Sequence, residues 1–387
     1  MIIDQLRIVG SPQTNKVMAG ELSRLAVRAL GRRPPEPKKA GTGQLLYPFD
    51  AGLAAVAATY LRTGTRAVWD LYRSDAQRLE PLYDDLVADV AADRRKWLPS
   101  PARISVEVRR MGDFAAGERQ VVGTVKNAIV DGAAVRGIDV VVDAERPDVL
   151  VVARLDDDGS VVVAVDLGGG SMSQRGWRAA HGAAPLREHL AAVLLMLGRF
   201  DPRTDMLVDP MCGAGTIPIE GLLMARGAPR LARPARPGIP ALDGAWPDER
   251  PLFGDSTPVV VGNDVELEAL VAAKQNAAAA GVTGEIVWRR GDFRGLDTAE
   301  IEAIAAERGR RPGGLIIANP PYGERLDPID LRLIYGALGD WCQQFRGWRA
   351  GFLVGNLDFE RAFGMRPRVK KPLSNGPIRA YWYGYDL

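Results

Sequence analysis

The sequence predicts an α/β protein. Its carboxyl-terminal part is expected to be a doubly wound, mostly parallel sheet, and a smaller α+β region precedes it. Two observations predict this class. From residue 185 onward, apolar strands alternate with helices, which is the pattern of a parallel sheet with helices on both faces. Ahead of that region, three consecutive glycines (168–170) open a run of small polar residues typical of a hinge or functional loop.

The length and composition fit a globular protein of two or three domains. The chain has 387 residues, of which 47% are hydrophobic and 25% are charged. Apolar runs such as 161–167 and 192–198 are far shorter than the ~20 residues that span a membrane, and the amino terminus lacks a signal-peptide core. We therefore expect a cytoplasmic protein.

Cysteine and histidine are scarce. Cys212 and Cys342 are too few and too far apart for a disulfide framework, and His181 and His189 are too few for a zinc cage. No metal is expected.

Positive charge gathers at the two ends of the chain, although the net charge is only +2. The basic residues are Lys16, Arg24, Arg28, Arg32, Arg33, Lys38 and Lys39 at the start, and Arg361, Arg366, Arg368, Lys370 and Lys371 at the end. Such clusters can track phosphates, and they are also typical of a solvated face.

Four segments are expected along the chain: an amino-terminal part (1–62), an α+β domain (63–167), a linker (168–184) and the regular α/β domain (185–387). The expected helices are 21–30, 50–61, 81–97, 186–200, one from 216, 266–281, 299–309 and 331–345. The expected strands are 102–111, 148–156, 160–167, one ending at 209, 259–264, 285–292, 315–321 and 349–356, followed by a closing hairpin.

An insert rich in Pro and Arg (229–258) interrupts the α/β pattern where only a short connection is needed. A long irregular insert is either functional or disordered. The sequence favours a surface flap near the substrate, and a disordered insertion without a role is the alternative.

The first candidate motif is the glycine turn after the strand that ends at Asp209. Gly213 and Gly215 let a ligand approach the backbone closely, beside the free N–H groups of a helix start. A dinucleotide, a phosphate and another nucleoside cofactor all remain open. The third glycine of the dinucleotide fingerprint and the lysine of a phosphate loop are missing, which weakens the first two.

The next two strands also end in acidic residues. Asp264 can accept hydrogen bonds from both hydroxyls of a ribose. Asp292 can accept from the 6-amino group of adenine, whose face Phe293 can cover. Each aspartate alone could equally be a helix cap. Three successive strand ends that fit one nucleoside favour a nucleoside site.

The fourth strand ends in Asn319, Pro320, Pro321 and Tyr322. Prolines fix the backbone and donate no hydrogen bond, so the Asn319 side-chain carbonyl and the Pro320 backbone carbonyl are free to accept from an NH₂ group. Tyr322 offers a ring on which a base can stack. The motif therefore predicts a site for a planar amine, against the alternative of a proline-rich turn.

These motifs resemble those of a known family. DPMCGAGT (209–216), NPPYGERL (319–326) and the segment 262–281 are similar to class I S-adenosylmethionine-dependent RNA methyltransferases with a THUMP domain, especially the bacterial 23S rRNA guanine-N2 group. VKNAIVDG (125–132) resembles a helix start of the THUMP module. Segments 174–192 and 373–387 resemble the lead into the catalytic domain and its terminal hairpin. The resemblance covers roughly residues 40–387.

The resemblance implies a Rossmann-like methyltransferase domain behind a ferredoxin-like part (1–62) and an RNA-gripping THUMP domain (63–167). It implies S-adenosylmethionine as cofactor and the 2-amino group of a guanine as acceptor. The implied cofactor-binding residues are Asp209, Pro210, Cys212, Gly213, Ala214, Gly215, Thr216, Asp264, Asp292, Phe293 and Asn319. The implied catalytic residues are Asn319, Pro320, Pro321 and Tyr322, and the implied RNA contacts are Lys126, Arg175 and Arg178.

The leading hypothesis is therefore a guanine-N2 methyltransferase acting on 23S rRNA. A tRNA guanine is the first alternative. Methylation of an amine in DNA or protein shares the logic of the Asn-Pro-Pro-Tyr motif, and a non-catalytic RNA-binding factor is the alternative from another class.

Overall fold

The computed structural model describes residues 1–110, 112, 114–180, 186–230, 237–254, 257–321, 327–375 and 378–387. The chain divides into two compact units. The first comprises Met1–Gly10, Leu22–Met172 and Arg233–Glu249, and the second comprises Ser11–Glu21, Ser173–Ala232 and Arg250–Leu387. Within the described residues, none of the helices has both the length and the apolar composition to cross a membrane.

The first unit is built on one eight-stranded sheet with the order β2-β3-β1-β4-β8-β7-β5-β6. Its strands are β1 (Ile2–Gly10), β2 (Lys38–Lys39), β3 (Gln44–Pro48), β4 (Gly64–Ser74), β5 (Ala102–Arg109), β6 (Val140–Val142), β7 (Val149–Leu155) and β8 (Val161–Asp166). Only β5 pairs in parallel, with β6 and β7. The expected amino-terminal part and α+β domain thus share a sheet, because β4 pairs with both β1 and β8.

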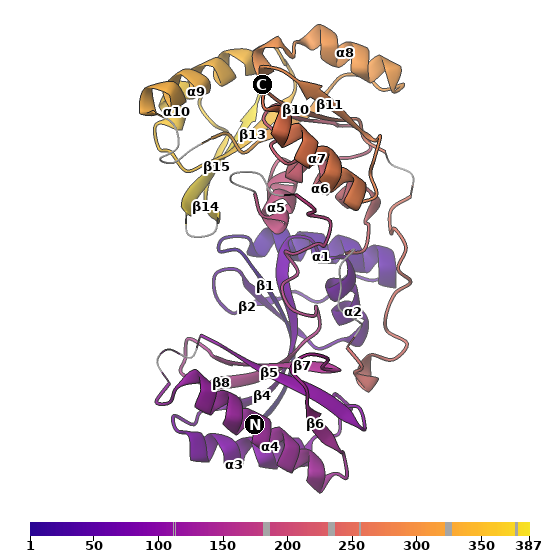
Figure 1. Cartoon of the computed structure of the whole chain (residues 1–387), viewed down its shortest axis with the longest axis vertical. Helices are drawn as coiled ribbons and strands as arrows, with labels where there is room; N and C mark the ends of the chain where they lie inside the picture. The colour runs from indigo at the N-terminus through magenta and orange to yellow at the C-terminus, as the bar shows by residue number, and fades with distance from the viewer. Residues whose placement is uncertain are drawn as a thin grey trace. The chain divides into compact units, whose positions relative to one another are not determined.

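The helices of this unit are α1 (Asn15–Leu30), whose first residues belong to the second unit, α2 (Ala51–Tyr60), α3 (Leu79–Ala92) and α4 (Glu118–Val135). Helices α3 and α4 lie side by side (Figure 1), and Gly132 lets them approach because an added Cβ would lie 2.7 Å from Val90. The stretch 125–132, expected at a helix start, lies inside α4. That expectation was wrong, because the helix begins at Glu118.

Residues 237–249 of the long insert belong to the first unit, and the other described residues of the insert belong to the second. The expected place of the insert as a flap near the substrate stays a prediction. The Gly238 N–H donates to the Asp148 carbonyl, and the Tyr60 hydroxyl donates to the Asp248 carbonyl. A short 3₁₀ turn, η1 (Pro240–Leu242), buries Leu242. Residues 231–236 and 255–256 of the insert lie outside the described residues.

The second unit has a seven-stranded sheet with the order β11-β10-β9-β12-β13-β15-β14. Its strands are β9 (Met206–Asp209), β10 (Val260–Asp264), β11 (Ile286–Arg290), β12 (Gly314–Ala318), β13 (Arg349–Val354), β14 (Val369–Asn375) and β15 (Ile378–Asp386). Strands β9 to β13 are parallel, and β14 and β15 form the antiparallel pair at one edge. This is the doubly wound, mostly parallel sheet that the sequence predicts, including the terminal hairpin.

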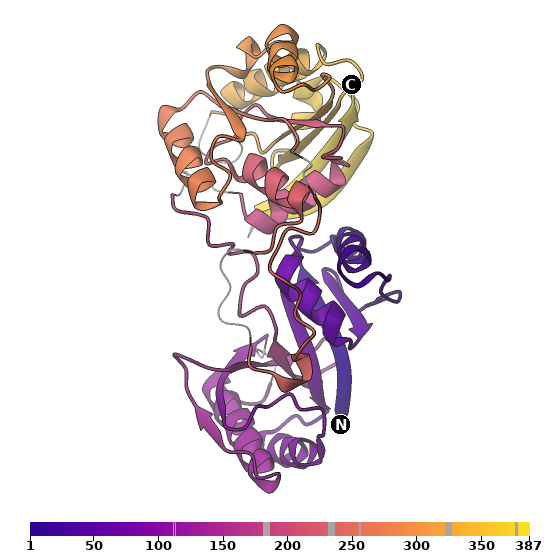
Figure 2. The same cartoon turned by 90° about the vertical axis from the view of Figure 1, so that its right-hand side faces the viewer.

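Helices cover both faces of this sheet (Figure 2). They are α5 (Glu188–Leu197), α6 (Thr216–Arg226), α7 (Leu267–Ala279), α8 (Thr298–Glu307), α9 (Pro328–Cys342) and α10 (Phe359–Phe363), with the 3₁₀ turn η2 (Phe293–Gly295). Alternate residues of β9 face opposite cores: Leu207 packs with α5, α6 and α7, and Val208 packs with α8, α9 and α10. Such burial on both faces makes the strands continuously apolar.

The strand order brings the ends of β11, β10, β9 and β12 together in that sequence at one edge. Because these strands are parallel, their carboxyl ends meet at the same edge, where doubly wound sheets bind ligands. The sequence predicts that the candidate motifs follow the ends of these four strands, and the bounds of β9, β10, β11 and β12 confirm that prediction.

Candidate functional site

The turn between β9 and α6 holds two glycines in the left-handed region, with different surroundings. Gly215 has φ +79°, and an added Cβ would lie 2.8 Å from the Trp288 ring. Gly213 has φ +52°, and an added Cβ would have no described atom within 4 Å. Gly215 is thus required for packing, whereas nothing described crowds the backbone at Gly213.

Asp209 closes β9 with a carboxyl group that is almost fully enclosed. Its Oδ1 accepts from the Met211 N–H at 3.1 Å. Burial, backed by the nearby charge of Asp264, raises the pKa of Asp209 well above its ordinary range. Burial also raises the pKa of the Cys212 thiol, so this cysteine is a packing residue rather than a nucleophile.

Asp264, at the end of β10, holds the glycine turn in place. Its Oδ2 accepts from the Gly213 N–H at 2.8 Å, and its Oδ1 accepts from the Glu266 N–H at 3.0 Å. The residue is half-buried, so its oxygens keep room to accept further hydrogen bonds. This is where the sequence predicts a contact with ribose hydroxyls.

Asn263 is a functional position that the sequence reasoning missed. The side chain is buried, and its Nδ2 donates to the Pro210 and Gly291 carbonyls at 2.9 and 3.0 Å. Its Oδ1 accepts from the Arg289 guanidinium at 2.9 Å. One amide therefore links the ends of β9, β10 and β11. The only signal in the sequence is a polar residue directly before Asp264.

Asn276, a second missed residue, joins the same turn to the segment before α5. Its Nδ2 donates to the Ala214 and Ala180 carbonyls at 3.0 and 3.1 Å, and its Oδ1 accepts from the Ala180 N–H at 2.9 Å. The sequence gives only a weak signal for it, because an exposed amide, Gln275, stands beside it in the same alanine-rich stretch of α7.

Asp292 and Phe293 follow β11. The Asp292 carboxylate is exposed and accepts from the backbone N–H and the guanidinium of Arg294, which holds the pKa of Asp292 below its usual range. Phe293 is mostly buried and meets Trp341 edge to face, with ring centroids 5.8 Å apart. Both lie at the expected edge, while their contacts with an adenine remain a prediction.

The end of β12 presents a different kind of group. The Asn319 Oδ1 atom is enclosed, and no described residue donates a hydrogen bond to it. Pro320 is buried, and the Pro321 carbonyl accepts from the Tyr335 hydroxyl at 2.7 Å, which fixes the backbone just beyond Asn319. Tyr322, expected to stack on a base, lies outside the described residues.

The three arginine and lysine positions expected at RNA have different surroundings. Arg175 is 1% exposed and forms an ion pair with Glu220, so its side chain is enclosed by the protein where the sequence predicted a contact with RNA. Arg178 donates to Glu188 at 2.8 Å and to the Thr216 hydroxyl at 3.2 Å, so it fixes the start of α6. Lys126 is half-buried on α4.

The polar groups at this edge are backbone amides, carboxylates and side-chain amides, which suit an organic cofactor. Among the described residues, no group of three or more His, Cys, Asp or Glu side chains could hold a metal ion. The residues present fit S-adenosylmethionine: nothing described crowds the backbone at Gly213, and the half-buried Asp264 carboxylate can accept from ribose hydroxyls.

Known proteins have a similar fold or a similar sequence. A crystal structure of a putative methyltransferase complexed with SAH superposes with a TM-score of 0.80 and 22% identity, over 99% of this chain and 97% of that chain. That likeness shows the fold alone.

Two relatives are named Ribosomal RNA large subunit methyltransferase K/L. The protein of Chromohalobacter salexigens is 34% identical over 352 residues, which are 85% of this chain and 46% of the relative. The protein of Alteromonas mediterranea is 30% identical over 374 residues, which are 92% of this chain and 50% of the relative. This chain spans about half the length of these relatives.

Residues 175–383 match the family model described as RMKL-like, methyltransferase domain. The matched segment begins at Arg175 and ends in β15, so it includes the glycine turn, the three acidic strand ends and Asn319. It also accounts for more than half of the sequence. The chain therefore belongs to the family of RMKL-like methyltransferases.

Proposed function

We propose that this chain transfers a methyl group from S-adenosylmethionine to the exocyclic 2-amino group of a guanine in 23S rRNA. The observation that carries the proposal is the enclosed Asn319 Oδ1, which lacks a donor among the described residues. A buried acceptor without a partner is rare and needs an explanation. An amine that enters the site from the substrate supplies one. Family membership and the names of the relatives support the choice of methyl transfer and of large-subunit rRNA.

The donor binds at the ends of β9, β10 and β11 in this proposal. Gly213 offers open backbone, Asp264 has room for the ribose hydroxyls, and Phe293 borders the adenine. When bound, S-adenosylmethionine supplies a methyl group on a positively charged sulfur.

The acceptor binds at the end of β12. Asn319 Oδ1 and the Pro320 carbonyl accept the two N–H groups of the amine, and Pro320 has no N–H of its own that would compete. Two acceptors fix both the position and the plane of the amine. Such orientation supplies much of the acceleration when a reaction needs little acid or base catalysis.

In this proposal the first unit binds the RNA. The amino-terminal part (1–62) is ferredoxin-like, and residues 63–167, which include Lys126, form a THUMP domain. A linker (168–184) then leads to the methyltransferase domain (185–387). Recognition is by shape and phosphate contacts. The target guanine must leave its stack to reach Asn319, which costs a few kcal/mol that the RNA contacts offset.

The test is transfer of tritium from labelled S-adenosylmethionine to unmodified 23S rRNA and, separately, to tRNA, followed by nucleoside analysis. Asn319→Ala should lower the rate about 100-fold, comparable to the loss of one transition-state hydrogen bond in other enzymes. Gln344→Ala is the matched control, because it removes an exposed amide near the end of α9.

Label in rRNA as N2-methylguanosine, lost in Asn319→Ala and kept in Gln344→Ala, is the expected result. Label only in tRNA would support the same mechanism with tRNA, rather than 23S rRNA, as the substrate. No label in either RNA, despite measurable donor binding, would overturn the proposal in favour of an acceptor in DNA or protein, or of a binding role.

A further inference from the structure

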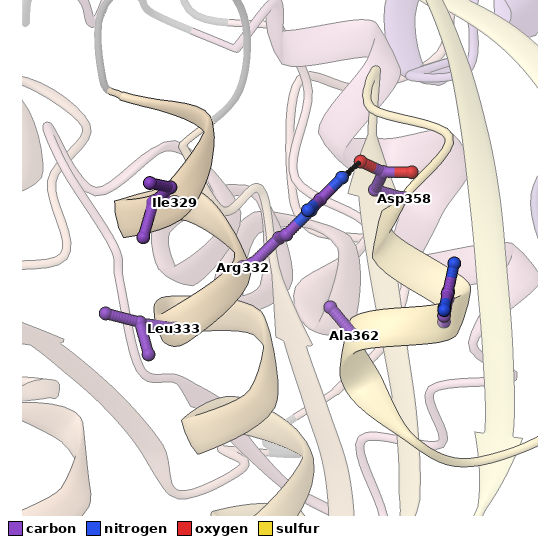
Figure 3. A pocket seen from close by; sticks show the side chains of 6 residues that line it. Ile329, Arg332, Leu333, Asp358 and Ala362 are labelled. Atoms are coloured by element: carbon purple, nitrogen blue, oxygen red, sulfur yellow. Dashed lines mark hydrogen bonds and ion pairs between the residues drawn. The ribbon is translucent and has the colours of Figure 1, made fainter.

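A groove of about 400 Å³ lies between α9 and α10, outside the donor site. Figure 3 shows Ile329, Arg332 and Leu333 on one wall, with Asp358 and Ala362 on the other. Arg361 completes the lining. The groove is open to solvent and has the size of a small-molecule site.

The strand order places this groove on the acceptor side of the catalytic edge. Helix α9 follows the end of β12 and α10 follows the end of β13, so their first turns lie at the carboxyl ends of these strands. In the order β11-β10-β9-β12-β13, the expected donor residues are on one side of β12, and the groove is on the other. Substrate extending from Asn319 away from the donor therefore meets the groove.

The walls combine exposed apolar side chains with positive charge. Ile329 is 68% exposed and Leu333 is 67% exposed, which is unusual for side chains of this size on one helix face. Arg332 donates to Asp358 across the groove at 2.7 Å. Arg361 is exposed, and no described carboxylate pairs with it, so the lining residues carry a net charge of +1.

A hydrogen bond connects one wall of the groove to the backbone of the Asn-Pro-Pro segment. The Tyr335 hydroxyl, from α9, donates to the Pro321 carbonyl at 2.7 Å. The same ring meets Phe359, the first residue of α10, edge to face with centroids 5.0 Å apart. One buried tyrosine thus fixes both walls relative to the proposed amine site.

We propose that this groove binds the RNA nucleotide next to the target guanine, with its base against Ile329 and Leu333 and its phosphate at Arg361. The inference rests on the proposed function and names a contact of the RNA that the first unit does not supply. Bases that leave the stack lie against aromatic or apolar side chains, and an arginine without a carboxylate partner suits a phosphate.

The test measures methylation of unmodified 23S rRNA by the full chain carrying Arg361→Gln or Leu333→Ser. Each variant should raise KM for the RNA about tenfold, the loss expected for one good contact, while kcat and donor affinity stay near wild type. Arg361→Gln should also lower the slope of log affinity against log salt by about one, because one phosphate contact is removed. Leu333→Ser should leave that slope unchanged.

Arg308→Gln is the matched control, because Arg308 is equally exposed and directly follows α8, at the opposite edge of the sheet. If the wild-type protein is active and both groove variants keep its KM and its salt slope, the inference about the groove is overturned, while the proposed function stands. A wild-type protein without activity on any RNA would overturn the proposed function, and the inference with it. A dimer that dissociates in Leu333→Ser without a change in KM would assign the groove to a second copy of the chain.

Discussion

The two halves of the catalytic edge are built on different principles. On the donor half, polar groups at the ends of β9, β10 and β11 already satisfy one another: Asn263 links three strands, and Asp264 holds the Gly213 N–H. On the acceptor half, at β12 and β13, Asn319 Oδ1 has no described donor, and the adjoining groove exposes Ile329 and Leu333.

The difference shows which polar groups have hydrogen-bond partners within the protein and which are left for a ligand. Internal hydrogen bonds set the geometry of the donor half before anything binds, and preorganisation of this kind lowers the cost of binding. The acceptor half leaves an unsatisfied oxygen and exposed apolar surface, which the incoming RNA covers in our proposal. Substitutions in the two halves should therefore affect different quantities.

The largest expected effect on folding comes from Asn263→Ala, in the donor half. It leaves two backbone carbonyls and part of the Arg289 guanidinium without their partner. Each buried group left unsatisfied costs about 1–3 kcal/mol. Because three groups lose their partner, we expect a loss of about 5 kcal/mol in the free energy of unfolding and a weakened donor site, measured by urea denaturation and donor titration. An unchanged denaturation midpoint would contradict the linking role of Asn263.

The second prediction separates the two glycines of the turn. Gly215→Ala should cost about 2–4 kcal/mol, because its Cβ adds a clash with Trp288 to the strain of a left-handed backbone. Gly213→Ala should cost only about 1–2 kcal/mol, since its Cβ meets open space, and should instead reduce donor affinity. Thermal denaturation with and without donor distinguishes the two. Equal stability losses would contradict the assignment of Gly215 to packing and Gly213 to the ligand.

The smallest expected effect is a change in pH dependence. Because burial raises the pKa of Asp209, the unfolded chain loses this proton at lower pH than the folded chain. Folding stability therefore falls as pH rises above about 4, the ordinary pKa of aspartate. Asp209→Asn removes this slope and keeps an oxygen for the Met211 N–H. Its advantage in Tm over wild type should grow from pH 4 upward, whereas a constant difference would contradict a raised pKa.

The sequence predicted the parts of the site that depend on strand order. A glycine turn, two aspartates and an asparagine at successive strand ends had to meet, because parallel strands share one carboxyl edge. It did not predict Asn263 or Asn276, whose roles depend on carbonyls that come from other strands and loops. An amide in the printed sequence does not reveal which distant carbonyl it faces.

The sequence did not reveal two further contacts, for a similar reason. Arg175 was expected to contact RNA, but its partner Glu220 is on α6 and only the fold brings them together. The composition of the insert is that of a loop and did not show that residues 237–249 pack in the first unit, where Tyr60 and Asp148 bond to them. In both cases a contact far away in the sequence determines where the residue lies.

The most direct test of the central claim is calorimetric titration of S-adenosylmethionine into wild type and Asn319→Ala, with methyl transfer to 23S rRNA measured on the same samples. If Asn319 holds the acceptor amine beside a donor half that is complete on its own, donor affinity should stay within about twofold while transfer falls about 100-fold. Donor affinity that falls in step with transfer, or transfer that persists in the variant, would contradict the account.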